Sequence, residues 1–475
     1  MTTFGIDFGT TNSAAVKLAP HAAPERYGDE AGDPYPSIVA IDRATGEAIG
    51  GRRVWEQRNH YIESGNYHVI SSVKWLLGKQ AVWRTEERIW TPQDVASFIL
   101  TQLSHRAAAL GVDQIRRAAI TIPVGFPPES RADLRVAAER AGIELSTFVT
   151  ESTAAFMRYL PDLRHCRHVA VFDWGGGTLD ISVLQLRNGA IVEIATEGME
   201  IAGDELDLDI ARTVHMIAME RRQTPVAFEM MSSVDRDTLR TKCEYAKRQL
   251  SNLPRVDLLM SSYGGAPLHL ELTADWLDSV VAPHVDLAIE RLTAAIAAAR
   301  LSFDAIDRLL LVGGSSKLRL LIDRLRHDPR YSAALHIATD AEWDVAHGAA
   351  IVEQSTGGYE LAESIGIVLS DNSYYELISP GTRVDGQDRT LVLSLVEDAR
   401  EANIIIDKRA SREGQLSDRA LAFSVKTQGF SLEELQLSYR ITLDLMLHVE
   451  ARSVSRAATE AVSKQSGKLL FAYRL

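Results

Sequence analysis

Short apolar runs that end in glycine turns recur along the first three quarters of the chain. The run 169–172 leads into a turn with three adjacent glycines, 175–177, and the run 181–184 leads out of it. The N-terminus repeats this arrangement, with a glycine and threonine turn at 9–13 followed by the apolar run 14–18. Each stretch predicts a strand, a tight turn and a second strand.

Two Asp–aromatic–Gly hairpins in one chain indicate an internal repeat. A third glycine turn, 313–316, follows the apolar run 309–312. The repeat suggests two related lobes that face each other, with a nucleotide between them. Helical patterns separate the strands, and one of them begins with Thr91, Pro92 and Asp94, which are typical of a helix start.

After residue 364 the pattern changes to short runs in which every second residue is apolar. Turn residues separate these runs, so the pattern predicts an all-β unit of about eight strands. The runs are 365–369, 391–395, 404–406, 422–426, 435–441 and 443–449.

The triple-glycine turn has the chemistry of a phosphate site. Glycines let backbone N–H groups approach a ligand, and a row of such groups suits phosphate oxygens. Asp173 and Asp180 flank the turn. Carboxylates beside a polyphosphate need a cation between them, which implies Mg²⁺. For this stretch alone, an ordinary glycine-rich hairpin with two solvated aspartates remains the alternative.

Composition narrows the class of protein. The 475 residues allow two to three domains, and 46% hydrophobic with 24% charged residues is ordinary for a soluble globular chain. A formal net charge of −13 argues against a nucleic-acid partner. Cys166 and Cys243 lack metal-ligand spacing, and neither a signal peptide nor a membrane-spanning run is expected. We therefore expect a cytoplasmic protein without a membrane partner.

Several segments together resemble one known family. They are 5–13, 120–123, 151–155, 243–251 and 311–315. The hairpins and the third turn resemble the phosphate and adenosine motifs of the actin, sugar-kinase and heat-shock ATPase superfamily. The five segments narrow this to the seventy-kilodalton heat-shock protein (DnaK-type) chaperones. The resemblance covers about residues 1–355 well and continues loosely to the C-terminus.

The resemblance implies an α/β fold, in which a two-lobed actin-like ATPase with duplicated ribonuclease-H-like lobes precedes an all-β sandwich. The expected boundaries are 1–357 for the nucleotide-binding domain (lobe I about 1–165 plus 345–357, lobe II about 166–344), 358–364 for a linker and 365–475 for a substrate-binding-like sandwich. The linker is polar here, and the helical lid that follows the sandwich in the family is expected to be absent.

The resemblance also assigns catalytic roles. Asp7, Glu151 and Asp173 would hold Mg²⁺ mainly through waters. Thr178 and Asp180 would position water or a second cation, for which K⁺ is a candidate. Lys74 would stabilise the transferring γ-phosphoryl group, although a lone lysine in an apolar stretch can instead extend its amine to solvent.

The implied ATP or ADP contacts come from all three glycine turns, a further turn and one helix. They are Gly9, Thr10, Thr11, Asn12, Gly175, Gly176, Gly177, Thr178, Gly203, Asp204, Glu244, Lys247, Arg248, Ser251, Gly313, Gly314, Ser315 and Lys317. The four residues at 244–251 share one helical face because of their spacing. A solvated charged face is the alternative for that helix.

The chain departs from the family pattern at several places, among which Ser152 replaces a proline, Ala202 a glycine, Lys317 an arginine and Leu445 a glycine. Pro123 and Arg131 match family positions that link nucleotide state to domain docking. A strand-ending proline and a surface arginine are the alternative interpretation.

The resemblance therefore implies an ATP-dependent molecular chaperone of the heat shock protein 70 type, with slow ATP hydrolysis that controls the binding of unfolded polypeptide. A nucleotide-gated scaffold for one dedicated protein partner is the first alternative. A small-molecule kinase of the same superfamily is the second. Response to a J-domain co-chaperone is doubtful because the linker is polar. The sequence does not identify the client, the nucleotide exchange factor or the oligomeric state.

Overall fold

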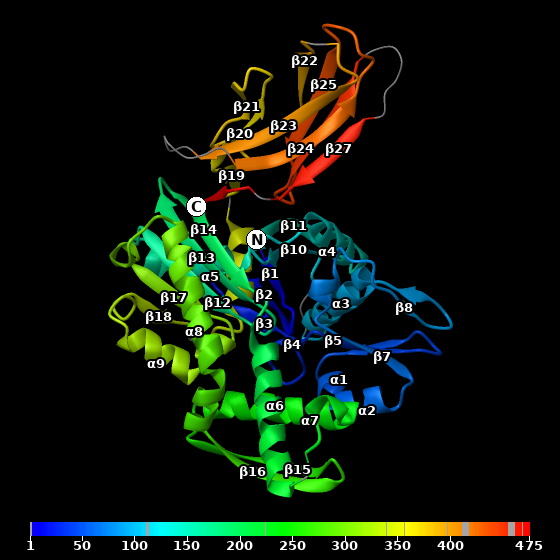
Figure 1. Cartoon of the computed structure of the whole chain (residues 1–475), viewed down its shortest axis with the longest axis vertical. Coiled ribbons are helices and arrows are strands. Elements are labelled where there is room, and N and C mark those ends of the chain that lie inside the picture. The colour runs from blue at the N-terminus through cyan, green and yellow to red at the C-terminus, as the bar shows by residue number, and fades with distance from the viewer. Residues whose placement is uncertain are drawn as a thin grey trace. The chain divides into compact units, whose positions relative to one another are not determined.

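The computed structural model describes residues 2–110, 114–223, 225–338, 340–355, 357–396, 398–410, 418–454, 461–467 and 469–475. The chain divides into two compact units, whose elements are labelled in Figure 1. The first unit comprises Met1–Val124, Asp133–Leu184 and Ala195–Gln354. The second comprises Gly125–Ala132, Gln185–Ile194 and Ser355–Leu475.

The N-terminal hairpin lies in the first sheet of the first unit, which has the strand order β11-β10-β1-β2-β3, with β4 beside β2. Strand β1 is antiparallel to β2 and parallel to β10, and β10 is parallel to β11. The bounds are β1 (Thr3–Phe8), β2 (Asn12–Leu18), β3 (Glu25–Tyr27), β4 (Tyr35–Pro36), β10 (Arg117–Ile122) and β11 (Glu144–Thr150).

Two glycines allow helices to pack closely beside this sheet. A Cβ on Gly5 of β1 would lie 2.1 Å from the backbone nitrogen of Ala350 in α10 (Asp344–Gln354). A Cβ on Gly348 of α10 would lie 1.7 Å from the carbonyl oxygen of Ala154 in α5 (Glu151–Leu163). Both contacts are too short for a side chain. Glycine therefore sets the packing that places the start of α5 near the turn after β1.

The triple-glycine hairpin belongs to a second sheet, which contains the strand order β18-β17-β12-β13-β14. Strand β12 is parallel to β17, which is parallel to β18. The bounds are β12 (His168–Trp174), β13 (Leu179–Arg187), β14 (Ala190–Met199), β17 (Arg308–Val312) and β18 (Leu335–Ile337). Every residue of β12 is buried, so its continuous apolar run reflects burial on both faces.

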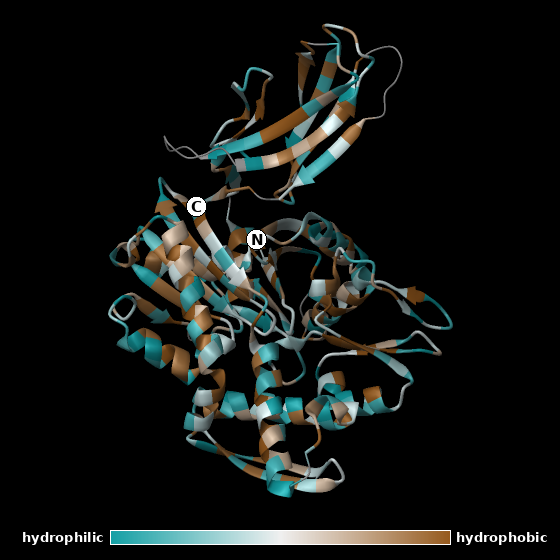
Figure 2. Cartoon of the chain, in the orientation of Figure 1, coloured by the Kyte–Doolittle hydropathy of each residue, from teal (hydrophilic) through white to brown (hydrophobic). Residues whose placement is uncertain are grey.

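Helices make up most of the rest of the first unit, and the more exposed of them are more hydrophilic. The predicted helix start at Thr91 is confirmed, since Thr91 caps α3 and forms a capping box with Asp94. Helix α7 is largely hydrophilic, in contrast to the brown central strands of Figure 2. The remaining elements are β5 (Ile38–Asp42), β6 (Ala48–Gly50), α1 (Arg52–Glu56), α2 (Arg58–Glu63), β7 (Tyr67–Ser71), β8 (Trp83–Arg84), β9 (Ile89–Trp90), α3 (Pro92–Ala109), α4 (Pro128–Arg140), α6 (Gly203–Arg222), α7 (Ser233–Leu250), β15 (Arg255–Tyr263), β16 (Ala266–Thr273), α8 (Ala274–Ala298) and α9 (Arg319–His327).

The period-two runs form β-strands in the second unit. Its described residues contain two four-stranded antiparallel sheets with the orders β21-β20-β23-β24 and β22-β25-β26-β27. Alternate apolar residues of these strands share one buried core. The bounds are β20 (Glu363–Val368), β21 (Tyr374–Ile378), β22 (Arg389–Ser394), β23 (Glu401–Ala410), β24 (Asp418–Lys426), β25 (Glu434–Ile441), β26 (Leu447–Ser453) and β27 (Val462–Ser466).

Residues 358–364, predicted as a linker, contain β-structure. Strand β19 (Tyr359–Leu361) pairs with β28 (Phe471–Arg474), and β28 also pairs with residues 190–192 at the start of β14. Both pairings are antiparallel. The last strand of the chain is thus held on both edges within the second unit.

Arg131 is buried within the second unit and is therefore not the surface arginine of the alternative interpretation. Its side chain is 5% exposed, and its guanidinium donates to the carbonyl oxygens of Asp444 (2.8 Å) and Leu445 (3.1 Å). Leu445, which stands where the resemblance has glycine, has a φ of +59°. This is the left-handed region that favours glycine. Arg131 therefore contacts a turn with local backbone strain.

In the described residues, no helix has both the length and the apolar character needed to cross a membrane.

Candidate functional site

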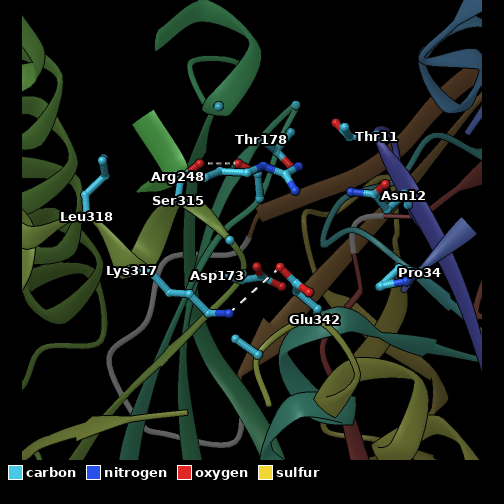
Figure 3. A pocket seen from close by; sticks show the side chains of 18 of the residues that line it. Thr11, Asn12, Pro34, Asp173, Thr178, Arg248, Ser315, Lys317, Leu318 and Glu342 are labelled. Atoms are coloured by element: carbon cyan, nitrogen blue, oxygen red, sulfur yellow. Dashed lines mark hydrogen bonds and ion pairs between the residues drawn. The ribbon is translucent and has the colours of Figure 1, made fainter. Parts of the chain in front are cut away.

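The glycine turns of the first unit converge on one cavity of about 610 Å³. All the sequence-predicted catalytic and nucleotide-contact residues line it except Asp180, which is buried. Figure 3 shows side chains from several of these segments pointing into the cavity. The lining residues are Asp7, Gly9, Thr10, Thr11, Asn12, Lys74, Glu151, Asp173, Gly175, Gly176, Gly177, Thr178, Gly203, Asp204, Glu244, Lys247, Arg248, Ser251, Gly313, Gly314, Ser315 and Lys317.

The turns approach so closely that glycine is required at their contacts. A Cβ on Gly176 would lie 2.0 Å from Oγ1 of Thr11, so the tips of the two predicted hairpins touch. A Cβ on Gly313, whose φ is +81°, would lie 2.5 Å from Oδ1 of Asp173. The third turn thus meets the second hairpin at its aspartate. Backbone N–H groups from separate segments are brought to one place by these contacts.

A buried ion pair lies among the carboxylates of this cavity. The Lys74 side chain is 4% exposed, and its Nζ lies 2.5 Å from Oε1 of Glu151. Oδ1 of Asp7 accepts a hydrogen bond of 2.8 Å from the Thr121 hydroxyl. Asp173 is 9% exposed. Three carboxylates from two β-strands and one helix therefore surround a single lysine.

Burial and mutual repulsion shift the titration of this cluster. Burial, with the nearby charge of Glu151, raises the pKa of Asp7 from 3.8 to about 6. Burial also raises the pKa of Asp173, helped by repulsion from Glu151 and Asp180. For Lys74 burial acts to lower the pKa, but attraction to Glu151 and Asp7 outweighs it, so the pKa is raised. The site carries excess negative charge that one lysine does not neutralise.

The donor chemistry of this cluster fits a hard divalent cation. Carboxylate oxygens are the ligands that Mg²⁺ prefers, usually with retained waters. Oγ1 of Thr11 is buried in the cavity wall without a hydrogen-bond partner among the described residues. A buried hydroxyl of this kind is costly unless a ligand or water pairs with it. The carboxylates and the hydroxyl together suit Mg²⁺ and a polyphosphate.

Helix α7 presents its predicted face to the cavity. Lys247 Nζ lies 2.8 Å from Oδ1 of Asp207 and donates to the carbonyl oxygen of Gly203 at 3.2 Å. Arg248 pairs with Glu244 at 2.7 Å on the exposed side. Burial raises the pKa of Asp207 to about 6, although Lys247 opposes this. The charged side chains on this face of α7 therefore contact other protein groups, in contrast to the alternative interpretation of a solvated charged face.

Asp207 and Glu342 line the cavity but were not predicted as site residues. Asp207 follows the predicted contact Gly203 by one helical turn, so this spacing was an available signal. Glu342 forms an ion pair with Lys317, whose Nζ lies 3.8 Å from its Oε1. Figure 3 marks this pair with a dashed line. No local motif marks Glu342. Other lining residues without a sequence signal are Ala14, Pro34, Asn252, Leu318, Arg319, Ile322, Asp323, Arg326, Ala338, Ala341 and Val345.

Comparison with known proteins places the chain in a family. The family model described as Hsp70 protein matches residues 51–373, which is more than half of the chain. The chain belongs to the Hsp70 family. It is 27% identical to the chaperone protein DnaK of Thermosipho africanus and 28% identical to those of Thermotoga petrophila and Thermotoga maritima. Each alignment covers 96% of this chain and 79% of the relative.

Membership of the Hsp70 family gives the cavity a functional context. Hsp70 proteins are ATP-binding chaperones with ATPase activity, so this chain is a chaperone of the Hsp70 type. The expected family resemblance is confirmed.

Proposed function

We propose that this Hsp70 protein binds Mg·ATP in the 610 Å³ cavity and hydrolyses it slowly, which controls the binding of unfolded polypeptide to the β-sandwich β20–β27. The observation that carries the proposal is the cluster of Asp7, Glu151 and Asp173 around buried Lys74, beside glycine turns that touch one another. An arrangement of buried carboxylates, one lysine and backbone N–H groups suits phosphoryl transfer.

The residues of the cluster have distinct roles in this proposal. Mg²⁺, when bound, supplies positive charge to the phosphate oxygens. Asp7, Glu151 and Asp173 would hold it, mainly through waters, and Lys74 would donate to the γ-phosphoryl oxygens and so stabilise the charge that grows on them. Asp180 does not line the cavity and acts through its negative charge, which raises the pKa values of Lys74 and Asp173. Thr178 orients the attacking water. Thr178 and Asp180 would also be the residues to hold a second cation such as K⁺.

We assign the nucleotide to particular walls of the cavity. The turns at 9–12, 175–178 and 203–204 hold the phosphates through backbone groups. The purine and ribose lie between the α7 face and the turn at 313–317. In this proposal residues 1–357 form a two-lobed actin-like ATPase with duplicated ribonuclease-H-like lobes, and residues 365–475 form the substrate-binding sandwich.

Calorimetry and turnover on one preparation test the proposal. Nucleotide-free protein should release heat on titration with Mg·ATP, and single-turnover assays should show slow release of phosphate. Binding that disappears when Mg²⁺ is chelated would support the carboxylate assignment. Absence of heat with Mg·ATP in protein shown to be folded by circular dichroism would overturn it. Asp257→Asn, a change in an exposed hairpin aspartate, is the matched control for later variants.

A nucleotide-gated scaffold for one protein partner is the second candidate. Lys317 favours it, because this residue is 45% exposed and paired with Glu342. A lysine stacks on a purine less well than an arginine, so nucleotide turnover could serve a slow switch. A pull-down that returns one stoichiometric protein supports the scaffold, whereas binding to many unfolded peptides supports the chaperone.

A further inference from the structure

A hydrogen bond between two fully buried hydroxyls joins the helix that carries Glu151 to the strand that carries Asp180. The Ser182 hydroxyl donates to Oγ of Ser152 at 2.9 Å, and both residues are 0% exposed. Ser152 is the second residue of α5, directly after Glu151. Ser182 lies in β13, two residues after Asp180. Two segments of the candidate site, distant in sequence, are therefore linked beneath the cavity.

Ser152 and Ser182 lie so close in sequence to Glu151 and Asp180 that their hydrogen bond bears on the positions of these two carboxylates. Alternate residues of a strand point to the same face, so Asp180 and Ser182 share the face of β13 that meets α5. At the other end, the start of α5 is fixed by Thr150, whose hydroxyl accepts from the backbone N–H of Thr153 at 3.2 Å. A shift of this first turn would move Ser152 and Glu151 together.

We propose that Ser152 and Ser182 are a pair of positioning residues that hold Glu151 at its place beside Lys74, in register with Asp180. The inference rests on the proposed ATPase activity and adds the element that aligns its carboxylates. Neither hydroxyl lines the cavity, so the pair acts through Glu151 and Asp180 and has no direct contact with the nucleotide.

The pair is a feature of this chain because the family pattern has proline at the position of Ser152. Proline fixes its own φ angle but carries no hydroxyl. In this chain a hydrogen bond across the interior connects the same point of the helix to β13. Loss of one hydroxyl would leave the other buried without its partner, which is unfavourable enough to displace the helix start.

A double-mutant cycle tests the proposal. We expect Ser152→Ala and Ser182→Ala each to lower kcat by ~10-fold, since small displacements of catalytic groups are costly, and to leave KM for Mg·ATP nearly unchanged. The double variant should be no slower than either single variant, because both break the same bond. Ser152→Thr, which keeps the hydroxyl, should retain kcat.

Ser104→Ala is the matched control for a purely structural loss. Ser104 is also buried and accepts a backbone hydrogen bond of 3.1 Å from Ile115, but it lies in α3 and does not line the cavity. Its loss should lower thermal stability and leave kcat unchanged. An equal fall of kcat in Ser104→Ala, or independent effects of the two serines, would overturn the positioning role.

The outcomes separate this inference from the proposed function. If the unaltered chain hydrolyses ATP and the serine variants match it, only the positioning role fails. If the unaltered chain shows no hydrolysis, both fail together. Should an alanine variant not fold, Ser152→Cys keeps the volume with a weaker hydrogen bond. A lower kcat at unchanged KM in that variant would support the role, and an unchanged kcat would refute it.

Discussion

Lys74 Nζ lies 2.5 Å from Oε1 of Glu151, and the two side chains are only 4% and 12% exposed. Two charges so far from water are held at a cost in desolvation, which their attraction and further hydrogen bonds must offset. Because Asp7 and Asp173 lie in the same cavity wall, the pair is one part of a cluster with more carboxylates than cations. This imbalance is what a bound cation would correct.

Asp173→Asn should weaken Mg·ATP binding by at least ~10-fold, since a contact to a charged group is worth about 1.5–3 kcal/mol. Calorimetry on nucleotide-free protein measures the effect. The loss should be smaller when nucleotide is titrated without Mg²⁺, because the aspartate acts through the cation. Asp257→Asn should bind as the unaltered chain does. Equal losses with and without Mg²⁺ would contradict a cation-holding role.

Lys74→Ala should leave Mg·ATP binding largely intact and lower turnover by at least ~10-fold, as expected when a contact to transition-state charge is removed. Single-turnover hydrolysis and calorimetry on the same preparation separate the two effects. Lys79→Ala, at a nearby exposed lysine, is the control. Unchanged turnover would favour the alternative in which Lys74 only balances the charge of Glu151.

The raised pKa of Asp7 predicts that stability falls as pH rises. Between 3.8 and about 6 the folded protein keeps the proton of Asp7 and the unfolded chain releases it. The free energy of unfolding therefore decreases through this window, by up to about 3 kcal/mol for this group. Urea unfolding of nucleotide-free protein from pH 4 to 7 measures the slope.

Asp7→Asn removes the titrating group and should flatten that part of the pH dependence. The amide keeps the size of the side chain and its contact with Thr121. A slope identical in the unaltered chain and the variant would show that Asp7 does not hold its proton in this window. Asp257→Asn, at an exposed site, should leave the slope unchanged.

The turns of the site could be predicted from the sequence because their chemistry is local. Pairs of residues that lie far apart in the sequence could not be predicted. Gly176 and Asp173 belong to a short motif in which the need for glycine at a tight backbone turn can be recognised from the sequence. The partner of Lys247 was missed because Asp207 lies 40 positions earlier, and no periodicity links the two residues. Such contacts depend on how α6 packs beside α7, which a single sequence does not reveal.

The period-two pattern likewise predicted the strands of the second unit but not all their partners. Alternation of apolar residues tells which face of a strand is buried, so the sandwich core could be anticipated. It does not tell which edges meet. The pairing of β28 with both β19 and β14 therefore came from the structure. Within the segment predicted as a linker, Tyr359–Leu361 pair with β28.

Stimulation by a generic J-domain co-chaperone should be weak or absent. The family has an apolar linker where this chain has Glu360 and Glu363. Glu360 pairs with Arg474 at 2.9 Å, and buried Glu363 accepts a backbone hydrogen bond of 2.8 Å from Leu470. These contacts hold the segment in place. A rate increase of ~10-fold on adding a generic J-domain, within the usual range of allosteric coupling, would contradict this expectation.

Lys317→Arg should tighten nucleotide binding by ~2- to 5-fold, the gain expected when a planar guanidinium stacks at a partly exposed aromatic face. Lys317 lines the cavity and forms a 3.8 Å pair with Glu342, in which both side chains are nearly half exposed. An arginine can keep this ion pair and also lie flat on a purine. Competition titrations with a fluorescent ADP measure the affinity.

Lys79→Arg controls for a general effect of guanidinium, because Lys79 is exposed and does not line the cavity. Glu342→Gln removes the ion pair but keeps Lys317, so it shows how much the ion pair alone affects nucleotide affinity. If Glu342 restrains Lys317 away from the base, the glutamine variant should also bind more tightly, and the gain should fade at high salt where the pair is screened. Unchanged affinity in Lys317→Arg, together with unchanged affinity in Glu342→Gln, would place the purine elsewhere in the cavity.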